Sequence, residues 1–306
     1  MKTRIILLLC ALLGKEITEK LLLNYSILKN GNKELKYAIK NNRRFKDTHK
    51  GERCFILGNG PSLKDVDLNM LAEEFVFSVN NFSMVQDYKK AKTNVHLWAD
   101  LSFFEMREDQ KYNHDELMEN YYKISEEKPI CFLCEQAYSF VKKYELDNIL
   151  DINYFRAYSP IDSKTRRQFD LSKALVSYST VVQYAIAIAI YMGFKEIYLL
   201  GCDSTNIVSV INCAMNKENK EMHAYENDDV DKRYKELLKH WTMTEIFYDQ
   251  YYLFEGYRTI KDECDKKGIL LVNCSTNTLI NEIPRMSLTD VLSDKREGEY
   301  WNNEKC

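Results

Sequence analysis

Short apolar runs alternate with longer segments of helical pattern along most of the chain. Most of these runs end in a small or polar residue, which is typical of a buried strand followed by a turn. They predict strands at 54–57, 75–79, 95–98, 130–133, 149–152, 196–200 and 269–272. Helices are expected at 64–72, 114–126, 178–192 and 228–267, the last two ended by Gly193 and Gly268. This alternation predicts an α/β fold with a mostly parallel sheet covered on both faces.

The strand and helix pattern spans residues 53–295, which we expect to form a single domain. The chain of 306 residues is 45% hydrophobic and 29% charged, an ordinary composition for a globular protein. An N-terminal arm over 1–52 precedes the domain, and a polar tail over 296–306 follows it. Residues 153–176 are expected to be irregular and basic. The mostly polar residues 204–227 are expected to form a mobile lid loop over the strand ends.

The N-terminal arm combines an apolar run with excess positive charge. Residues 1–53 carry 13 Lys/Arg and 5 Asp/Glu, a net charge of +8, whereas the remaining 30 Lys/Arg and 41 Asp/Glu give −11. The run Ile5–Leu13 is too short to span a bilayer as a helix. We expect an amphipathic helical arm that either lies on an anionic membrane, at the inner face of the cell membrane, or docks on the protein's own body. Residues 29–52 are expected to be a linker.

The stretch from Cys54 to Leu63, CFILGNGPSL, predicts a strand, a glycine turn and the start of a helix. Gly58 and Gly60 are expected to take positive φ and to let a ligand approach the backbone closely. Pro61 suits the first turn of a helix, and free N–H groups there, beside Ser62, predict an anion site. The pattern lacks the third glycine of the dinucleotide fingerprint and the lysine of a P-loop. A structural turn without a ligand is therefore the alternative.

Hydrogen-bonding side chains follow several of the predicted strands. In an open parallel sheet, ligands bind outside the carboxyl ends of the strands. Neutral amides and hydroxyls at this edge can bind a base and a ribose while backbone N–H groups hold phosphate. The residues expected at this nucleotide-binding rim are Gly58, Asn59, Gly60, Ser62, Asn80, Asn81, Asp100, Ser179, Thr180, Asp203, Asn273 and Ser275.

His223 is the best candidate for proton transfer, because histidine titrates near neutral pH and this one lies in the expected lid loop. The alternative is a solvated loop histidine with no function. His96 lies inside a predicted strand and is expected in the core.

Self-association of the protein is left open, and we expect no nucleic-acid partner.

No metal site or cofactor is expected. Asp65 and Asp67 have the spacing of a divalent-ion motif, but they fall at a predicted helix start, where carboxylates cap the N-terminus. Cys131 and Cys134 form a Cys-x-x-Cys pair, but no second pair or histidine cluster follows that would complete a zinc site. The nine cysteines are expected to be reduced, as in a cytoplasmic protein.

Four stretches resemble, in order, segments of the bacterial lipooligosaccharide sialyltransferases. They are 55–64 (FILGNGPSLK), 95–105 (VHLWADLSFFE), 180–203 (TVVQYAIAIAIYMGFKEIYLLGCD) and 269–279 (ILLVNCSTNTL). The resemblance implies a single Rossmann-like domain and metal-independent transfer from a CMP-activated sugar. It also implies a lid histidine as general base, matched by His223, and a lid tyrosine at the leaving phosphate, matched by Tyr225.

The glycine turn and the Gly-x-Asp strand end at 201–203 are also similar to those of the MptE-like proteins, named for a 6-hydroxymethylpterin diphosphokinase. We expect a membrane-associated glycosyltransferase of polysaccharide biosynthesis. It would move a sugar, sialic acid or a related acid sugar, from a CMP-activated donor to a cell-surface glycan or lipid-linked acceptor. The alternatives are a 6-hydroxymethylpterin diphosphokinase, which would need Mg²⁺, and a non-catalytic nucleotide-binding scaffold at the membrane.

Overall fold

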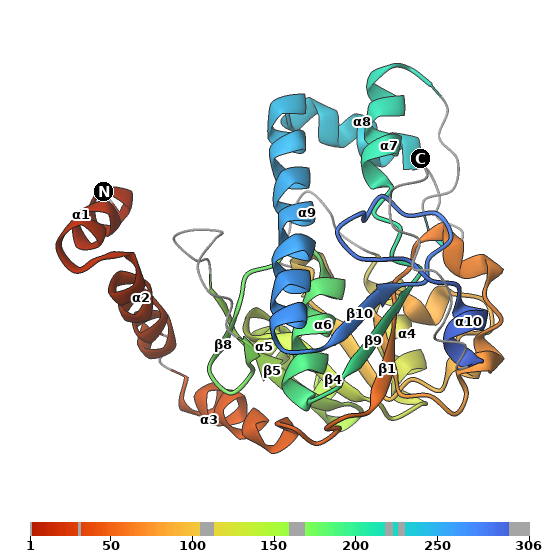
Figure 1. The fold of residues 1–306 in the computed structure, drawn as a ribbon, viewed down its shortest axis with the longest axis horizontal. Coiled ribbons are helices and arrows are strands. Elements are labelled where there is room, and N and C mark those ends of the chain that lie inside the picture. The colour runs from red at the N-terminus through yellow and green to blue at the C-terminus, as the bar shows by residue number, and fades with distance from the viewer. Residues whose placement is uncertain are drawn as a thin grey trace.

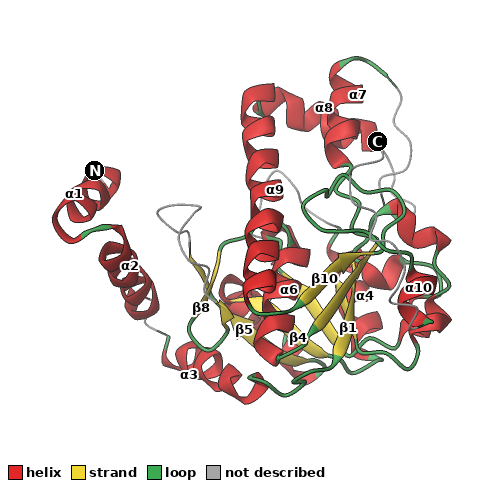
Figure 2. Ribbon diagram, in the orientation of Figure 1, coloured by secondary structure: helices red, strands yellow, loops and turns green. Residues whose placement is uncertain are grey.

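A parallel sheet forms the centre of the molecule (Figures 1 and 2). The computed structural model describes residues 2–29, 32–104, 113–158, 169–217, 223–225 and 230–293. Within these ranges the sheet has seven strands in the order β10-β9-β1-β2-β3-β4-β5, and every neighbouring pair is parallel. The strands are β1 (Arg53–Leu57), β2 (Val76–Val79), β3 (Val95–Trp98), β4 (Ile130–Cys134), β5 (Asp151–Phe155), β9 (Glu196–Leu200) and β10 (Leu270–Asn273). The predicted α/β fold is confirmed.

The strand order reverses beside β1. The chain adds β2 to β5 on one side of β1 and then returns to place β9 and β10 on the other side. In the register, Leu57 at the end of β1 lies opposite Leu200 at the end of β9. The loops that follow these two strands therefore leave the sheet side by side. A reversal of this kind opens a crevice at the carboxyl edge, where ligands bind in α/β proteins.

The two faces of the sheet are covered differently. On one face, α6 (Val181–Met192) packs across β1, β2 and β3, and α9 (Met243–Lys266) packs against α6 and β10 (Figure 1). The other face is covered by residues of 3₁₀ helices and of α10 (Leu288–Leu292). The 3₁₀ helices concerned are Pro61–Asp65, Leu68–Leu71, Phe82–Met84 and Tyr88–Ala91. Burial on both faces explains why most residues of the strands are apolar.

The α-helix expected at 64–72 is wrong, because two 3₁₀ helices occupy this region. Val66 has extended backbone between them, and the Asp67 carboxylate accepts a hydrogen bond from the Asn69 N–H at 3.0 Å. An aspartate that satisfies the backbone of a new turn competes with continuation of the preceding one.

Residues 33–45 belong to the body of the protein and are not a linker, contrary to the prediction for 29–52. The N-terminal region forms α1 (Lys2–Leu13), α2 (Lys15–Lys29), α3 (Lys33–Asn41) and a 3₁₀ helix over Asn42–Phe45. Leu35, Ile39 and Phe45 are buried in the main core. The Asn42 side chain donates to the Tyr154 and Leu171 carbonyls at 2.7 and 3.2 Å. In Figure 1, α1 and α2 stand to one side of the body. The second of these helices contacts it, since the Tyr158 hydroxyl donates to Glu19 at 3.3 Å and Leu23 packs against the small cluster of Tyr158, Ala174 and Val176.

The irregular region expected at 153–176 contains strand structure. It begins with the end of β5 and includes the three-stranded sheet of β6 (Ala157–Tyr158), β8 (Ala174–Val176) and β7 (Phe169–Asp170). Strands of two or three residues are too short to show a period-two pattern in the sequence. The helices α4 (His114–Ser125) and α5 (Tyr138–Lys143) lie before and after β4.

A small helical cap stands over one end of the sheet. It consists of α7 (Asn206–Ala214), α8 (Val230–His240) and the N-terminal half of α9 (Figure 1). Ile207 and Val210 of α7 pack with Tyr234 of α8 and Ile246 of α9. The prediction of a lid loop over 204–227 is therefore wrong for its first half, which is α7.

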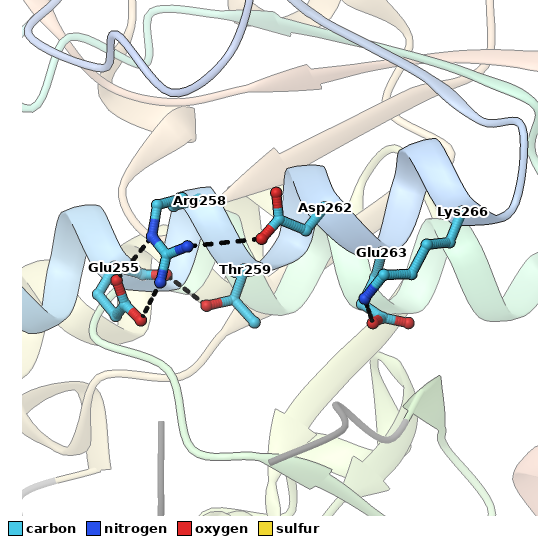
Figure 3. Close-up of polar contacts among 6 residues, drawn as sticks. All are labelled: Glu255, Arg258, Thr259, Asp262, Glu263 and Lys266. Atoms are coloured by element: carbon cyan, nitrogen blue, oxygen red, sulfur yellow. Dashed lines mark hydrogen bonds and ion pairs between the residues drawn. The ribbon is translucent and has the colours of Figure 1, made fainter. Parts of the chain in front are cut away.

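The C-terminal half of α9 is reinforced along its surface (Figure 3). Arg258 donates two hydrogen bonds to the Glu255 carboxylate, at 2.9 and 2.6 Å, and lies 3.6 Å from Asp262. Near the end of the helix, Lys266 pairs with Glu263 at 2.8 Å. Pairs of this spacing each stabilise a helix by a few tenths of a kcal/mol. They support the long helix that carries the cap.

Candidate active site

A cavity of about 500 Å³ lies between the carboxyl edge of the sheet and the helical cap. The sheet side is formed by the loops after β1, β2, β3 and β9 and by the loop that leads into α6. The cap side is formed by α8, α9 and the segment 223–225. The volume lies within the range of small-molecule binding sites.

Ten of the residues predicted for the site line this cavity. They are Gly58, Asn59, Gly60, Asn80, Asp100, Ser179, Thr180, Asp203, His223 and Tyr225. Ser62, Asn81, Asn273 and Ser275, also predicted at the rim, stand behind the lining and bond to residues of it or of its loops.

The glycine turn is shaped by contact with the neighbouring strand loop. Gly60 has φ −67°, so the positive φ expected for it is wrong. Gly58 is also absent from the glycines with positive φ among the described residues. A Cβ added at Gly60 would lie 2.6 Å from the Asp203 carboxylate and 2.7 Å from the Gly201 carbonyl oxygen. The glycines let the loops after β1 and β9 touch each other.

The anion site expected at the start of the helix after the turn is wrong, because the protein uses those donors itself. The Ser62 N–H donates to Asp203 at 2.8 Å, and the Ser62 hydroxyl donates to the second oxygen of the same carboxylate. The Gly60 N–H donates to the Gly201 carbonyl at 2.7 Å. Burial raises the pKa of Asp203, and the two bonds from Ser62 oppose that rise. Asp203 therefore ties the two loops together.

Asn273 and Ser275 support the β9 loop from behind. The Ser275 hydroxyl accepts from the Cys202 N–H at 2.8 Å, and the Asn273 amide donates to the Cys202 carbonyl at 3.4 Å. Asn81 is likewise buried behind the lining, where its amide donates to the Tyr225 hydroxyl at 3.4 Å. These side chains hold lining residues in place.

Two buried amide oxygens at the cavity have no hydrogen-bond partner among the described residues, namely Oδ1 of Asn59 and Oδ1 of Asn80. The Nδ2 of Asn59 donates to the Val79 carbonyl at 2.9 Å, which orients that amide. A buried acceptor without a partner costs about 1–3 kcal/mol. A ligand that brings N–H or O–H donors would remove this cost.

His96 fixes the backbone of Asn80 from the core. Asn80 has φ +50°, in the left-handed region that asparagine tolerates best after glycine. Its carbonyl accepts from Nε2 of His96 at 3.1 Å, and Nδ1 of His96 accepts from the Ser78 hydroxyl at 2.7 Å. Burial lowers the pKa of His96 to about 3, so the ring is neutral. The core position predicted for His96 is confirmed.

His223 lies beside the glycine turn. Its ring stacks on Tyr225, with centroids 4.9 Å apart and planes 9° from parallel. The N–H of Ala224 between them donates to the Asn59 carbonyl at 2.9 Å. The segment 223–225 is thus bonded to the turn, and both rings line the cavity.

The solved structures that are similar to this chain include two glycosyltransferases. The sialyltransferase CstII from Campylobacter jejuni, determined in complex with a substrate analogue, cytidine-5′-monophosphate, is 21% identical with a TM-score of 0.41. The match covers 76% of this chain and 84% of CstII. The MAf glycosyltransferase from Magnetospirillum magneticum AMB-1 is 14% identical with a TM-score of 0.41, over 85% of this chain and 41% of that one.

Both of these structures are glycosyltransferases. Neither one bears on the MptE-like proteins. No family model matches the chain, and no curated protein matches it.

The cap side of the cavity was not foreseen from the sequence. Trp241, Asp249 and Gln250 line it, together with Tyr234 and Tyr257. One signal was available: Gln250 stands in the stripe Ile246-Gln250-Leu253-Tyr257, whose other members are apolar and whose spacing is that of one helix face. A polar residue in such a stripe needs a polar partner.

Two further observations concern metals and cysteines. No group of three or more His, Cys, Asp or Glu that could hold a metal ion occurs in the described part of the chain. Cys131 and Cys134, the closely spaced pair on β4, are buried free thiols.

Proposed function

We propose that the cavity binds a CMP-activated sugar and that the protein transfers this sugar to a glycan acceptor. The observation that carries the proposal is the pair of amide oxygens on Asn59 and Asn80, which follow the neighbouring strands β1 and β2 and have no partner among the described residues. The exocyclic amine of cytosine and the hydroxyls of ribose are donors that such oxygens accept. Three of the four stretches that resemble sialyltransferases contribute lining residues, which supports the same proposal.

The nucleotide phosphate would lie at the start of α6. Val181 and Val182, the first two residues of that helix, line the cavity beside the Ser179 and Thr180 hydroxyls. The positive end of the helix dipole favours a phosphate there. This location replaces the turn at 58–62, where the N–H groups of Gly58, Gly60 and Ser62 are bonded to the β9 strand and its loop.

In the proposed reaction, His223 accepts the proton of an acceptor hydroxyl as that oxygen attacks the anomeric carbon of the donor sugar. The bond between the anomeric carbon and the phosphate oxygen breaks, and CMP leaves with the electron pair. The hydroxyls of Thr180 and Tyr225 and the start of α6 would stabilise the negative charge on the leaving phosphate. The proposal needs no metal ion.

Nucleotide binding is tested by thermal shift with CMP, CDP, UDP, GDP and ATP, each with EDTA and with Mg²⁺. We expect CMP to raise the Tm equally under both conditions. A ligand at 100 times its Kd stabilises the folded state by about 2.7 kcal/mol. Asn59→Ala should reduce this shift, and Asn69→Ala, at an exposed turn, should keep it. Stabilisation by ATP with Mg²⁺ and not by CMP would point to the diphosphokinase.

The role of His223 is tested with a CMP-sugar and a saccharide acceptor. His223→Ala should keep the CMP shift and lower the transfer rate about 100- to 10,000-fold, the usual cost of removing a general base. His240→Ala, on the exposed surface of α8, is the control and should transfer at the parent rate. A His223→Ala rate within a few-fold of the parent would remove this residue from the mechanism. Normal CMP binding with no transfer by the parent would favour the scaffold.

We further propose that α1 and α2 hold the protein on an anionic membrane, at the inner face of the cell membrane. Leu8, Leu12 and Ile17 are each more than half exposed, and basic residues accompany them along both helices. Apolar side chains beside basic ones suit the interface of an anionic bilayer. None of the described helices is long and apolar enough to cross a membrane.

A further inference from the structure

Gln250 is a buried polar side chain in the lining of the cavity. The residue is 7% exposed, and its Oε1 has no partner in the part of the chain that the structure describes. It lies on the inward face of α9 with Ile246, Leu253 and Tyr257, all of which line the cavity. An unpaired acceptor on an apolar helix face is costly and points to a ligand that supplies a donor.

Two neighbours of Gln250 make the same wall suitable for a sugar. Asp249 is an exposed residue that also lines the cavity, and partial burial of its carboxyl raises the pKa of that group. Trp241 is 40% exposed and also lines the cavity, at the corner between α8 and α9. Carboxylate and amide oxygens accept hydrogen bonds from hydroxyls, and an indole ring packs against the C–H face of a pyranose.

The wall is held in place before any ligand arrives. The backbone N–H of Trp241 donates to the Leu237 carbonyl at 2.9 Å. Thr242 then begins α9 with a capping box, in which its N–H donates to the Glu245 carboxylate at 2.8 Å and its hydroxyl accepts from the Glu245 N–H at 3.3 Å. The corner that carries Trp241 is therefore fixed relative to Asp249 and Gln250, two turns along the same helix.

The charge of the residues that line the cavity restricts which acceptor sugars can bind. Among the described residues that line it, three are aspartates and none is lysine or arginine. Asp203 is bonded to Ser62, whereas the exposed Asp249 has no hydrogen bond or ion pair to its carboxylate among the described residues. A carboxylate at this wall repels a carboxylate or phosphate on the acceptor.

We infer that Trp241, Asp249 and Gln250 form the acceptor subsite and that its ligand is the terminal, uncharged pyranose of a glycan. The assignment to the acceptor rests on the proposed function. The nucleotide occupies the sheet side of the cavity in that proposal, and the partly exposed Trp241 stands where a second substrate enters from solvent. Gln250 and Asp249 accept hydrogen bonds from sugar hydroxyls, and Trp241 stacks on the ring.

The test is saturation-transfer NMR on the full chain with defined saccharides, in the presence of CMP. The neutral probes are lactose, cellobiose, mannobiose and N,N′-diacetylchitobiose, and the anionic probes are glucuronic acid and glucose 6-phosphate. We expect at least one neutral disaccharide to bind and both anionic probes to bind more weakly. Trp241→Ala and Gln250→Leu should each weaken the neutral probe about tenfold or more. Tyr122→Ala, an exposed tyrosine on α4, should leave binding unchanged.

Stability measured on the same variants separates binding from folding. Gln250→Leu removes an unpaired buried acceptor while keeping a side chain of similar size, so the Tm should stay the same or rise while saccharide binding falls. Asp249→Asn should narrow the preference for neutral over anionic probes. Parent-like binding in Gln250→Leu, or equal binding of the anionic probes by the parent, overturns the inference.

The CMP thermal shift tests the proposed function independently of saccharide binding. If CMP shifts the Tm and no saccharide binds, the acceptor subsite is wrong and the nucleotide site stands. If saccharides bind through Trp241 and Gln250 but CMP does not shift the Tm, the sugar subsite stands and the CMP donor is wrong.

Discussion

Replacing Gly256 by alanine should destabilise the protein, although alanine is the better helix former. Gly256 lies inside α9, where glycine costs about 1 kcal/mol relative to alanine. A Cβ at this position would lie 2.5 Å from Nε2 of Gln183 on α6, and every atom it would approach so closely belongs to that one side chain. The glycine is explained by its neighbour on α6.

The magnitude follows from what Gln183 does. The side chain is fully buried, its Nε2 donates to the Leu253 carbonyl at 2.8 Å, and its Oε1 accepts from the Ser179 N–H at 3.2 Å. Displacing the amide strips two buried hydrogen bonds, at about 1–3 kcal/mol for each group left unpaired. After subtracting the gain in helix propensity of about 1 kcal/mol, Gly256→Ala should cost about 1–5 kcal/mol of unfolding free energy.

A double-mutant cycle tests this account. Gln183→Ala removes the obstructing atoms, so adding Gly256→Ala to that variant should be neutral or stabilising by up to about 1 kcal/mol. The four proteins are compared by urea unfolding followed by circular dichroism, with the shift in midpoint read at constant m. If Gly256→Ala has the same effect with and without Gln183, or stabilises the parent, the explanation of the glycine is wrong.

Two further predictions concern the core and the arm. Burial lowers the pKa of His96 from 6.5 to about 3, so between these values the unfolded chain binds one more proton than the folded protein. This histidine should therefore lower stability by about 1.4 kcal/mol per unit as the pH falls from 6 to 4. His96→Gln should remove that share of the slope in urea titrations at pH 6, 5 and 4, and equal slopes in the two proteins contradict the reasoning. Deleting residues 1–31 should abolish cosedimentation with anionic phosphatidylglycerol vesicles and leave a folded body that still unfolds cooperatively in urea, because Leu35, Ile39 and Phe45 remain in the core. Equal cosedimentation after the deletion rules out the arm as the anchor.

The architecture could be predicted from the sequence because its signals are local. A strand must be apolar where both of its faces are buried, as β1 and β9 are after their first residue. Gly193 ends α6 with φ +96° because an L side chain there would be strained. The polar residues that follow β1 and β2 had to reach the carboxyl edge once the sheet was parallel. Asn59 and Asn80 could therefore be placed near a site without knowledge of the strand order.

Tertiary structure decided which polar groups at that edge are already hydrogen-bonded within the protein and which are available to a ligand. Nothing in the sequence distinguishes Asn80, whose amide oxygen has no partner among the described residues, from Asn81, whose amide is bonded to Asn120 and Tyr225. Ser62 looked like part of an anion site, but its donors are occupied by Asp203, 141 residues away. Whether a hydrogen-bonding group is available depends on distant residues, and the local pattern does not contain them.

The same reason explains the cap. The charge and aromatic residues of 228–267 predicted helices, and α8 and α9 are present. Which face of α9 lines the cavity depended on the packing of Ile246 against α7 and on Gln183 of α6 fitting against Gly256. Local sequence therefore determined that α9 is a helix, because helix formation depends on neighbours three and four residues apart. Only contacts between distant segments decided that Trp241, Asp249 and Gln250 face the cavity, because side chains from other elements set how a helix is rotated and placed.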